Sequence, residues 1–377
     1  MLKQLYFDIA ATTPMDSAVA DIMHKANIEN YGNPSSMHML GQKSHNIVER
    51  SRTSIAKILN CKTSEIIFTS GGSESNNIIL KGVLKKGDHL ITSSYEHPSV
   101  LNLAKNLEEN GIEVSFVKPN KDGSIDVKDI ESEIKENTKL ISIMYVNNEL
   151  GTINPIKEIG DIAHENKILF HSDAVQFIGK ENLDLSTIKI DFATICAHKF
   201  YGPKGIGGFY CKSGIILTPL IDGGGQESGL RSGTENISSI LGMAKALEIS
   251  NDNNDTNKRQ ILKLESYFIE LLKQSNIDYR INGANRLPGI LNITFFGVEG
   301  HGLLMNLDMQ GIAISYGSAC SSGSANAPQA LIEIGMEENE ARCSVRISIG
   351  KMIVKDDIDK LFISIKNIVD RVKSNER

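Results

Sequence analysis

Residues 194–208, TICAHKFYGPKGIGG, carry a short apolar strand into a lysine that glycine and aromatic residues surround. Because Lys199 ends this apolar run, we expect its amine to be held partly out of water. Partial desolvation lowers the pKa of a lysine and makes its amine a nucleophile toward carbonyl groups. A lysine on an ordinary surface loop would fit the same pattern, so the neighbouring residues decide between the two interpretations.

The second strand-end polar group lies 26 residues before Lys199, in KILFHSDAVQ, where an apolar run over residues 168–170 delivers Asp173 and Gln176. A buried aspartate needs a cationic partner. The protonated pyridine nitrogen of pyridoxal phosphate is such a partner, and a lysine holds the aldehyde of that cofactor. An aspartate and a lysine at two strand ends therefore predict a pyridoxal phosphate site.

A resemblance to a known family rests on seven motifs in order along the chain: TSGGSESNN, YEHPSVLN, VNNELGT, SDAVQ, AHKFYGPKG, GGGQESGLRSGTEN and GSACSSGS. Together they resemble the pyridoxal-phosphate-dependent cysteine desulfurases of the NifS/IscS-like group. The resemblance extends from YFDIAATTP at residues 6–14 to VRISIG at residues 345–350. It implies the fold type I transferase architecture, a homodimer, and a C-terminal small domain that carries the catalytic cysteine.

Composition sets the broad class of the protein. The chain has 377 residues, 40% of them hydrophobic, which is enough for two domains with a sizeable core. We find no apolar run of transmembrane length and no signal-peptide pattern, so we expect no membrane association and a cytoplasmic location. Forty-six acidic against 40 basic residues give a net charge of −6, and the absence of a polybasic block disfavours direct binding of nucleic acid.

The alternation of apolar and amphipathic segments predicts an α/β fold. Short apolar strands at residues 88–92, 113–117, 140–145 and 168–170 are separated by helix-length sequence, which indicates a mostly parallel central sheet with flanking helices. We predict a large cofactor-binding domain over residues 14–250 and a smaller α+β domain made of residues 1–13 and 251–377. The polar run NDNNDTN at residues 251–257 is expected to be a connector, and we place the boundary between the two domains near it.

A strand over residues 65–70 followed by a helix over residues 73–84 places Gly72 and Ser73 at a helix N-terminus. Unpaired backbone N–H groups and the helix dipole favour an anion there, and the phosphate of the cofactor is our candidate. The turn is not a Walker loop, because no Lys-Ser/Thr pair follows at the required spacing. Earlier in the chain, the loop NYGNPSSMHMLG contains His38, which the pattern leaves open between solvent and the active site.

Ligands of open parallel sheets bind at the carboxyl ends of the strands, where His97, Asn148 and Asp173 are expected to meet. The resemblance implies that His97 stacks on the cofactor ring as a catalytic residue. It further implies that Asn148, Gln176 and His198 contact the cofactor, with Gln176 reaching the phenolic oxygen.

Two further residues complete the predicted site. Arg346 lies in the apolar strand CSVRISIG, so it needs an anionic partner, and the resemblance makes the carboxylate of the substrate that partner, with Asn148 beside it. The loop GGGQESGLRSGT precedes a helix that we expect to begin near Glu235. By resemblance, Thr234 of this loop reaches across the dimer interface to the cofactor phosphate of the neighbouring subunit.

The five cysteines are Cys61, Cys196, Cys211, Cys320 and Cys343, an odd number without a CxxC motif. This pattern argues against a disulfide framework and against a thiolate zinc site, and it indicates a reducing compartment. Cys320 differs from a buried structural cysteine because Ser, Ala and Gly flank it, as in a reactive loop. By resemblance it is the sulfur acceptor, and it can transiently ligate a nascent iron–sulfur cluster; we predict no other metal site.

Two positions depart from the family pattern. Cys196 stands where the family usually has a serine that contacts the cofactor phosphate, and a thiol is a poorer hydrogen-bond partner. After Cys320 the chain runs SSGSANAPQALIEIG, where the family more often has a Leu-Glu-Pro-Ser segment, so the length of the loop and its docking to partners are expected to differ.

The resemblance implies the reaction of a cysteine desulfurase. Arg346 would hold the carboxylate of L-cysteine, Lys199 would move the α-proton, and the Cys320 thiolate would take the sulfur, leaving alanine and a persulfide. The sulfur would then pass to an iron–sulfur scaffold or to a relay protein for tRNA or cofactor thiolation. A selenocysteine lyase or another class V aminotransferase would share Lys199 and Asp173. A zinc enzyme would instead gather His97, His171, Asp173, Cys196 and His198, but no HExxH-type spacing supports it.

Overall fold

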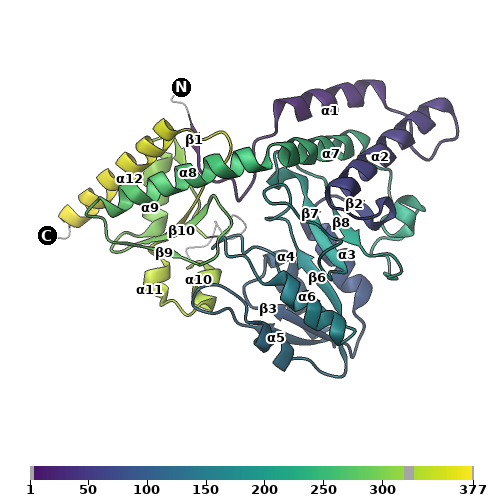
Figure 1. Ribbon diagram of the computed structural model, residues 1–377, viewed down its shortest axis with the longest axis horizontal. Helices are drawn as coiled ribbons and strands as arrows, with labels where there is room; N and C mark the ends of the chain where they lie inside the picture. Colours follow the sequence, from purple (N-terminus) through teal and green to yellow (C-terminus); the bar gives the residue numbers. More distant parts are fainter. Residues whose placement is uncertain (1–3, 318–326, 376–377) are drawn as a thin grey trace.

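The central sheet consists of β2 (Ile66–Thr69), β3 (His89–Ser93), β4 (Glu113–Val117), β5 (Thr138–Ser142), β6 (Leu169–Asp173), β7 (Phe192–Cys196) and β8 (Gly207–Cys211). In the computed structural model, which describes residues 4–317 and 327–375, these strands follow the order β2-β8-β7-β6-β5-β3-β4 (Figure 1). Only β8 runs against its neighbours β2 and β7, and every other pair of neighbours is parallel. The prediction of a mostly parallel central sheet is confirmed.

Helices surround this sheet: α1 (Ser17–Glu29), α2 (Met39–Ile58), α3 (Gly72–Val83), α4 (Pro98–Glu109), α5 (Val127–Ser132), α6 (Ile156–Glu165), α7 (Ile237–Asp252) and the 3-10 helices η1 (Thr63–Glu65), η2 (Ala197–Lys199) and η3 (Gln226–Gly229). Burial explains why the central strands read as continuous apolar runs. All five residues of β7 are buried, because a parallel strand with helices on both faces has no solvent side. The helices instead bury one face, as α6 does through Ile156, Ile159 and Ala163.

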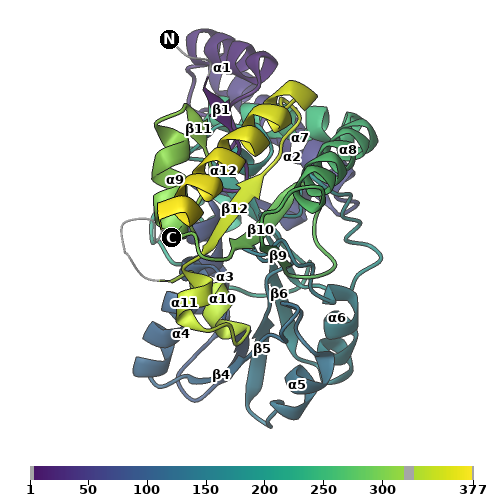
Figure 2. The same ribbon diagram turned by 90° about the vertical axis from the view of Figure 1, so that its left-hand side faces the viewer.

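The smaller part of the molecule contains β1 (Leu5–Tyr6), β9 (Tyr279–Asn282), β10 (Ile290–Phe295), β11 (Ile312–Ala313), β12 (Ser344–Ser348), α8 (Asn254–Lys273), α9 (Gly300–Asp308), α10 (Gln329–Glu333), α11 (Glu338–Ala341) and α12 (Lys355–Asn375). The strands form an antiparallel sheet in the order β12-β10-β9 and a parallel pair, β1 with β11. Figure 2 shows α12 crossing in front of β12 and β10, with α8 and α9 on either side. Buried residues of β1, α8, α9 and α12 form a hydrophobic cluster of their own with these strands.

Residues 251–257, which we expect to be a connector, are helical except at Asn253. α7 ends at Asp252 and α8 begins at Asn254, and Figure 1 shows the two helices end to end. The polar residues are satisfied within helical geometry: Asn253 Nδ2 donates to the carbonyl of Ile249 at 2.8 Å, and the buried Asn254 donates to Asn182 at 2.9 Å. Tertiary partners thus override the turn preference of asparagine. α7 packs into the core of the large sheet and α8 into the smaller cluster, while the boundaries at residues 13 and 250 stay a prediction.

The N-terminal segment links the two parts of the molecule. The backbone N–H of Thr13 donates to the carbonyl of His198 at 2.9 Å, and the N–H of Tyr201 donates to the hydroxyl of Thr13 at 2.7 Å. Residues 10–13 therefore run along η2, while β1, just before them, belongs to the smaller part. Among the described residues, no helix combines the length and the hydropathy that a bilayer span requires.

Candidate active site

The candidate active site is a pocket at the carboxyl ends of the parallel strands. Residues at the ends of five strands, β2, β3, β5, β6 and β7, line it together with the N-terminal segment and β12. Ten of the predicted site residues meet there: Gly72, Ser73, His97, Asn148, Asp173, Gln176, Cys196, His198, Lys199 and Arg346. Their functional roles stay predictions, but their convergence is the arrangement expected for a ligand of an open α/β sheet.

Lys199 is the last residue of η2, directly after β7. Its Nζ donates to the carbonyl of Ala10 at 2.7 Å and to the carbonyl of Ala11 at 2.9 Å. Both acceptors belong to the N-terminal segment, which the sequence analysis did not connect to the site. The two neutral carbonyl groups hold the amine at the pocket without neutralising its charge.

Asp173 ends β6 and is 7% exposed. Its Oδ2 accepts a hydrogen bond from Asn76 Nδ2 at 2.9 Å, and its Oδ1 accepts one from the backbone N–H of Val175 at 3.1 Å. Both donors are neutral, so the hydrogen bonds orient the carboxylate but do not balance its charge. A buried carboxylate in this state is suited to a cationic ligand atom.

A chain of polar groups connects Asp173 to His97. Asn76 donates to the hydroxyl of Ser99 at 2.8 Å, and the backbone N–H of Ser99 donates to His97 Nδ1 at 3.1 Å. Because Nδ1 accepts this bond, the proton of the neutral ring is on Nε2. Burial lowers the pKa of His97, Asp173 acts in the opposite direction, and Lys199 lowers it further. His97 is also the N-cap of α4, which fixes its backbone at the pocket.

The neighbour of His97 is an acid that is kept protonated. Burial raises the pKa of Glu96 to about 8, although the hydroxyl of Ser93 and the backbone N–H of Met144 both donate to its Oε1. The charge of Asp173 adds to the increase. The hydrogen bonds that Asp173 accepts come from neutral donors, so its carboxylate is the acidic group of the pocket that is suited to pair with a cation.

The other end of the pocket is suited to an anion. Gly72 and Ser73 form the first turn of α3, a 12-residue helix whose N-terminus faces the pocket. Gly207 allows the chain to come close at this turn, since a Cβ on it would lie 2.7 Å from the Cα of Gly71. Burial raises the pKa of the Cys196 thiol, so this group stays neutral and does not repel a phosphate.

Gln176 and His198 complete the wall around Lys199. Gln176 Nε2 donates to the carbonyl of Ala10 at 2.8 Å, the same oxygen that Lys199 contacts. His198 Nδ1 lies 3.1 Å from the hydroxyl of Thr12. Burial lowers the pKa of His198 to about 4, with Lys199 as the next cause, so His198 is neutral at physiological pH.

Arg346 forms an ion pair within the chain, with Asp8. The buried charge of Arg346 therefore does not require the substrate carboxylate as its partner. Its Nη2 donates to Asp8 Oδ1 at 2.7 Å, and its Nη1 donates to the carbonyl of Asn148 at 2.8 Å. The side chain is 1% exposed. Among the described residues, Nε has no hydrogen-bond partner, so the guanidinium keeps one N–H for a ligand.

Two other residues from the sequence analysis, Thr234 and His38, do not line this pocket. Thr234 is exposed and does not line the pocket of its own chain, so its predicted reach into a partner subunit stays a prediction. Cys320 lies outside the described residues. His38 caps α2 by accepting from the N–H of Gly41 at 3.2 Å and does not line the pocket, which favours a structural role.

The zinc alternative receives no support, because residues 4–317 and 327–375 contain no cluster of three or more metal-ligating side chains. His171, one of the five residues in that reading, is buried between the hydroxyls of Ser142 and Thr194, at 2.8 and 3.0 Å from its two ring nitrogens. Its ring nitrogens are thus engaged inside the sheet.

The sequence analysis missed several residues of the site. Asp8, Ala10 and Ala11 lie in YFDIAATTP, which had been used only as evidence of resemblance. Asn76 lies in TSGGSESNN, one helical turn after the predicted anion-binding residues. The polar type of Asn76, five positions after the N-cap Gly71, was a signal in the sequence, whereas only tertiary structure brings the backbone of Ala10 to Lys199.

The residues present fit pyridoxal phosphate. The pocket combines an amine for an aldehyde, a buried carboxylate that accepts hydrogen bonds from two neutral donors and is suited to a pyridinium nitrogen, and a helix N-terminus for a phosphate. These are Lys199, Asp173 and the first turn of α3. The three groups lie at the ends of three different strands, β7, β6 and β2.

Comparison with known proteins agrees with this chemistry. The family model described as aminotransferase class-V matches residues 5–361. The chain is 40% identical over 380 residues to "Cysteine desulfurase IscS" of Dictyoglomus turgidum. The match covers 99% of this chain and 96% of that relative.

Solved structures give the same assignment of fold. A structure titled "NIFS-LIKE PROTEIN" has a TM-score of 0.91 and 36% identity, and the match covers 97% of this chain and 99% of that one. A second structure, titled "SspA in complex with cysteine", has a TM-score of 0.83 and 38% identity. The match covers 92% of this chain and 99% of that one.

Proposed function

The chain belongs to the aminotransferase class-V family and is a cysteine desulfurase, and we propose that it binds pyridoxal phosphate at Lys199 and moves the sulfur of L-cysteine onto Cys320. In the overall reaction the C–S bond of cysteine breaks and an S–S bond to Cys320 forms. The β-carbon gains a hydrogen, so the products are L-alanine and a Cys320 persulfide. Atoms and electrons balance without a further oxidant or reductant.

The observation that carries the cofactor assignment is the meeting of Lys199 and Asp173 in one pocket, with neutral donors around the carboxylate. When bound, pyridoxal phosphate supplies an electron sink for the bonds at the α-carbon of the substrate. Asp173 would pair with the ring nitrogen, the first turn of α3 would hold the phosphate, and His97 would form one wall of the ring site. Cys196, as a neutral thiol, would donate to the phosphate where the family usually has a serine.

The substrate would be held by its carboxylate. Among the described residues, Arg346 Nε is buried and has no hydrogen-bond partner, and Asp8 and the carbonyl of Asn148 fix the plane of the guanidinium. Lys199, which lines the same pocket, would move the proton at the α-carbon. Arg346 therefore sets the orientation of the amino acid, and Lys199 performs the proton transfer.

Described residues on both sides of Cys320 in the sequence support its assignment to this site. Ser315 pairs with Arg346 through two backbone hydrogen bonds, at 2.8 and 3.0 Å, so the chain leaves the substrate-binding residue five positions before Cys320. On the return side, the backbone N–H of Ala330 interacts with the buried carboxylate of Glu149, the neighbour of Asn148. Both ends of the segment that carries Cys320 are thus tied to residues beside the pocket.

A homodimer is supported by exposed apolar side chains. Tyr31 and Met37 lie between α1 and α2, Met39 is the first residue of α2, and Ile216 and Ile221 follow β8. Both segments lie toward the right of Figure 1, on the side where α7 and α2 meet the sheet. Contiguous exposed apolar surface marks interaction sites. A second copy seated there would bring Thr234, on the same loop region, to the partner's cofactor site.

The acceptor of the sulfur is proposed only as a class. A persulfide on a segment of small residues can be handed to an iron–sulfur scaffold or to a sulfur-relay protein. The described cysteines, Cys61, Cys196, Cys211 and Cys343, are free thiols, which is consistent with the reducing conditions of the cytoplasm.

The test of the proposed function is to supply the purified, pyridoxal-phosphate-loaded protein with L-cysteine and a thiol reductant and to measure alanine and sulfide together. We expect the two products in equal amounts. Release of pyruvate and ammonia, or transamination without sulfide, would instead place the chain with another reaction of the aminotransferase class-V family. Selenocysteine supplied in parallel measures the preference between the two chalcogens.

A further inference from the structure

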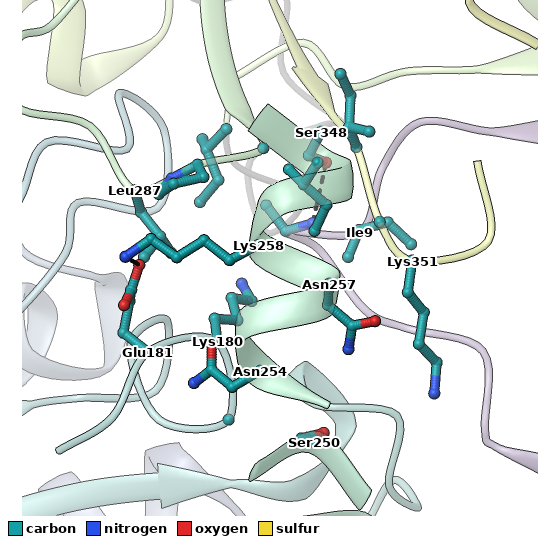
Figure 3. Close-up of a pocket in the computed structure, with 18 of the residues that line it drawn as sticks. Ile9, Lys180, Glu181, Ser250, Asn254, Asn257, Lys258, Leu287, Ser348 and Lys351 are labelled. Carbon is teal, nitrogen blue, oxygen red and sulfur yellow. Dashed lines mark hydrogen bonds and ion pairs between the residues drawn. The ribbon is translucent and has the colours of Figure 1, made fainter. Parts of the chain in front are cut away.

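A second pocket lies behind the candidate active site, between the turn after β6, the start of α8 and β12 (Figure 3). Lys180, Glu181, Lys258 and Lys351 are among the side chains around it. Ala10 lines this pocket as well as the candidate active site. The backbone of the N-terminal segment is therefore a shared wall, with Lys180 on one side and Lys199 on the other.

Lys180 contacts the candidate active site through Gln176. Its Nζ lies 2.5 Å from Gln176 Oε1. The other atom of this amide group, Gln176 Nε2, lies 2.8 Å from the carbonyl oxygen of Ala10. A backbone carbonyl can only accept, so the amide atom that faces Ala10 must belong to the NH₂ group, and the atom that faces Lys180 Nζ must be the oxygen. Gln176 also lines the candidate active site.

The acidic residues around Lys180 do not account for this contact. The adjacent carboxylate, Glu181, pairs with Lys258 at 2.6 Å, as Figure 3 also shows. Lys351 pairs with Asp16 at 2.7 Å. Among the described residues, the side chain that Lys180 Nζ contacts is the neutral amide of Gln176. A buried lysine with a purely structural role usually pairs with a carboxylate.

The environment of Lys180 is costly for a cation. Burial lowers the pKa of Lys180 well below its ordinary range, and the positive charges of Lys199 and Arg346 lower it further. Lys180 in turn contributes to the low pKa of His198. A lysine in a buried site near two other cations indicates a functional role. Its amine can donate a hydrogen bond to the amide oxygen of Gln176 whether it is charged or neutral.

We propose that Lys180 is a positioning residue of the cofactor site, which locks the amide of Gln176 so that its NH₂ group, and not its oxygen, faces the cofactor. The inference rests on the proposed function, in which Gln176 donates to the phenolic oxygen of pyridoxal phosphate. That oxygen carries negative charge, so an amide turned the other way would present an acceptor to an anion. A donor whose own oxygen receives a hydrogen bond is also a stronger donor.

A double-mutant cycle tests the proposal, because it separates an effect through Gln176 from a general effect of the charge or the fold. The proteins are wild type, Lys180→Met, Gln176→Ala and the double variant, each loaded with pyridoxal phosphate. The readouts are the dissociation constant for pyridoxal phosphate and the visible absorption maximum of the bound cofactor. Lys180→Arg is the matched control that keeps a donor, and thermal unfolding of the cofactor-free proteins checks folding.

We expect Lys180→Met to weaken pyridoxal phosphate binding about tenfold, the effect of one hydrogen bond to an anion, and to shift the absorption maximum. In the Gln176→Ala background the same substitution should change binding by less than about twofold and leave the maximum in place. Lys180→Arg should remain within about threefold of wild type. If Lys180→Met does not fold, Lys180→Gln, which is polar but too short for the contact, takes its place in the cycle.

Equal effects of Lys180→Met in both backgrounds, or no effect in either, would overturn the inference. Failure of the proposed function gives a different result: wild type would then acquire no visible absorption with pyridoxal phosphate, or would keep it in Lys199→Ala. The two failures are therefore distinguishable in the same set of proteins.

Discussion

Arg346 Nη2 lies 2.7 Å from Asp8 Oδ1, in an ion pair between β12 and the N-terminal segment, 338 residues apart in the chain. The backbone supports the pair, since Asp8 forms a bridge with Ser348. The ion pair engages Nη2, while Nε has no hydrogen-bond partner among the described residues. A residue near each end of the chain thus helps to build the site that the substrate carboxylate would occupy.

Arg346→Ala is expected to raise KM for L-cysteine by roughly 10- to 100-fold, the effect of losing a hydrogen bond to a charged group. The affinity for pyridoxal phosphate should change by less than about threefold, because Arg346 is not placed at the phosphate or at the ring nitrogen. Steady-state kinetics and a cofactor titration measure the two effects. Asp8→Asn, which keeps an acceptor for Nη2, is the matched control and should change KM much less. An equal loss of both affinities would mean that Arg346 is structural.

Lys199→Ala should abolish the covalent attachment of pyridoxal phosphate and lower kcat by at least about 10³-fold, because the same amine holds the aldehyde and moves the α-proton. Borohydride reduction of the loaded wild type followed by peptide mapping should place the pyridoxyl group on Lys199. Finding that group on any other lysine, such as Lys180 or Lys204, would reject the assignment.

Glu96→Gln should change the pH dependence of stability in a defined direction. Burial raises the pKa of Glu96 from 4.5 to about 8, so between these values the folded protein keeps a proton that the unfolded chain has released. The stability of the wild type therefore falls as the pH rises through this window. The glutamine variant lacks this loss, and its stability relative to wild type should increase by about 2–4 kcal/mol from pH 5 to pH 8. Urea unfolding at both pH values measures the difference, and a difference that is independent of pH would contradict the buried, protonated state of Glu96.

Much of the fold and of the site could be predicted from the sequence, for a physical reason. Strands buried on both faces, such as β7, read as apolar runs, and the polar residues that end them, Asp173 and Lys199, follow directly. The contributions of Asp8 and Ala10 could not be predicted, since they depend on where the N-terminal segment crosses the sheet ends and, for Ala10, on a backbone carbonyl. The helical junction at Asn253 was missed because asparagine-rich sequence favours turns unless tertiary partners satisfy it.

The proposed dimer surface can be tested with charges. Met37 and Ile216 are each 92% exposed, and a carboxylate at both positions would be buried against the partner without a counter-ion. The double variant Met37→Asp and Ile216→Asp should sediment as a monomer and bind pyridoxal phosphate more weakly, because Thr234 of the partner would be lost. A double variant at exposed methionines of the smaller part, Met309→Asp and Met352→Asp, should sediment as wild type does. Dissociation of both double variants, or of neither, would contradict this surface.

The most direct test of the central claim is the fate of the sulfur at Cys320. After incubation with L-cysteine and trapping with an alkylating reagent, mass spectrometry should find the wild-type peptide that contains Cys320 with one extra sulfur atom. Cys320→Ser should keep the visible absorption of the cofactor and its change on adding cysteine, while alanine formation falls to near background. Alanine release by Cys320→Ser at close to the wild-type rate would contradict the account, and an elimination that needs no protein thiol would replace it.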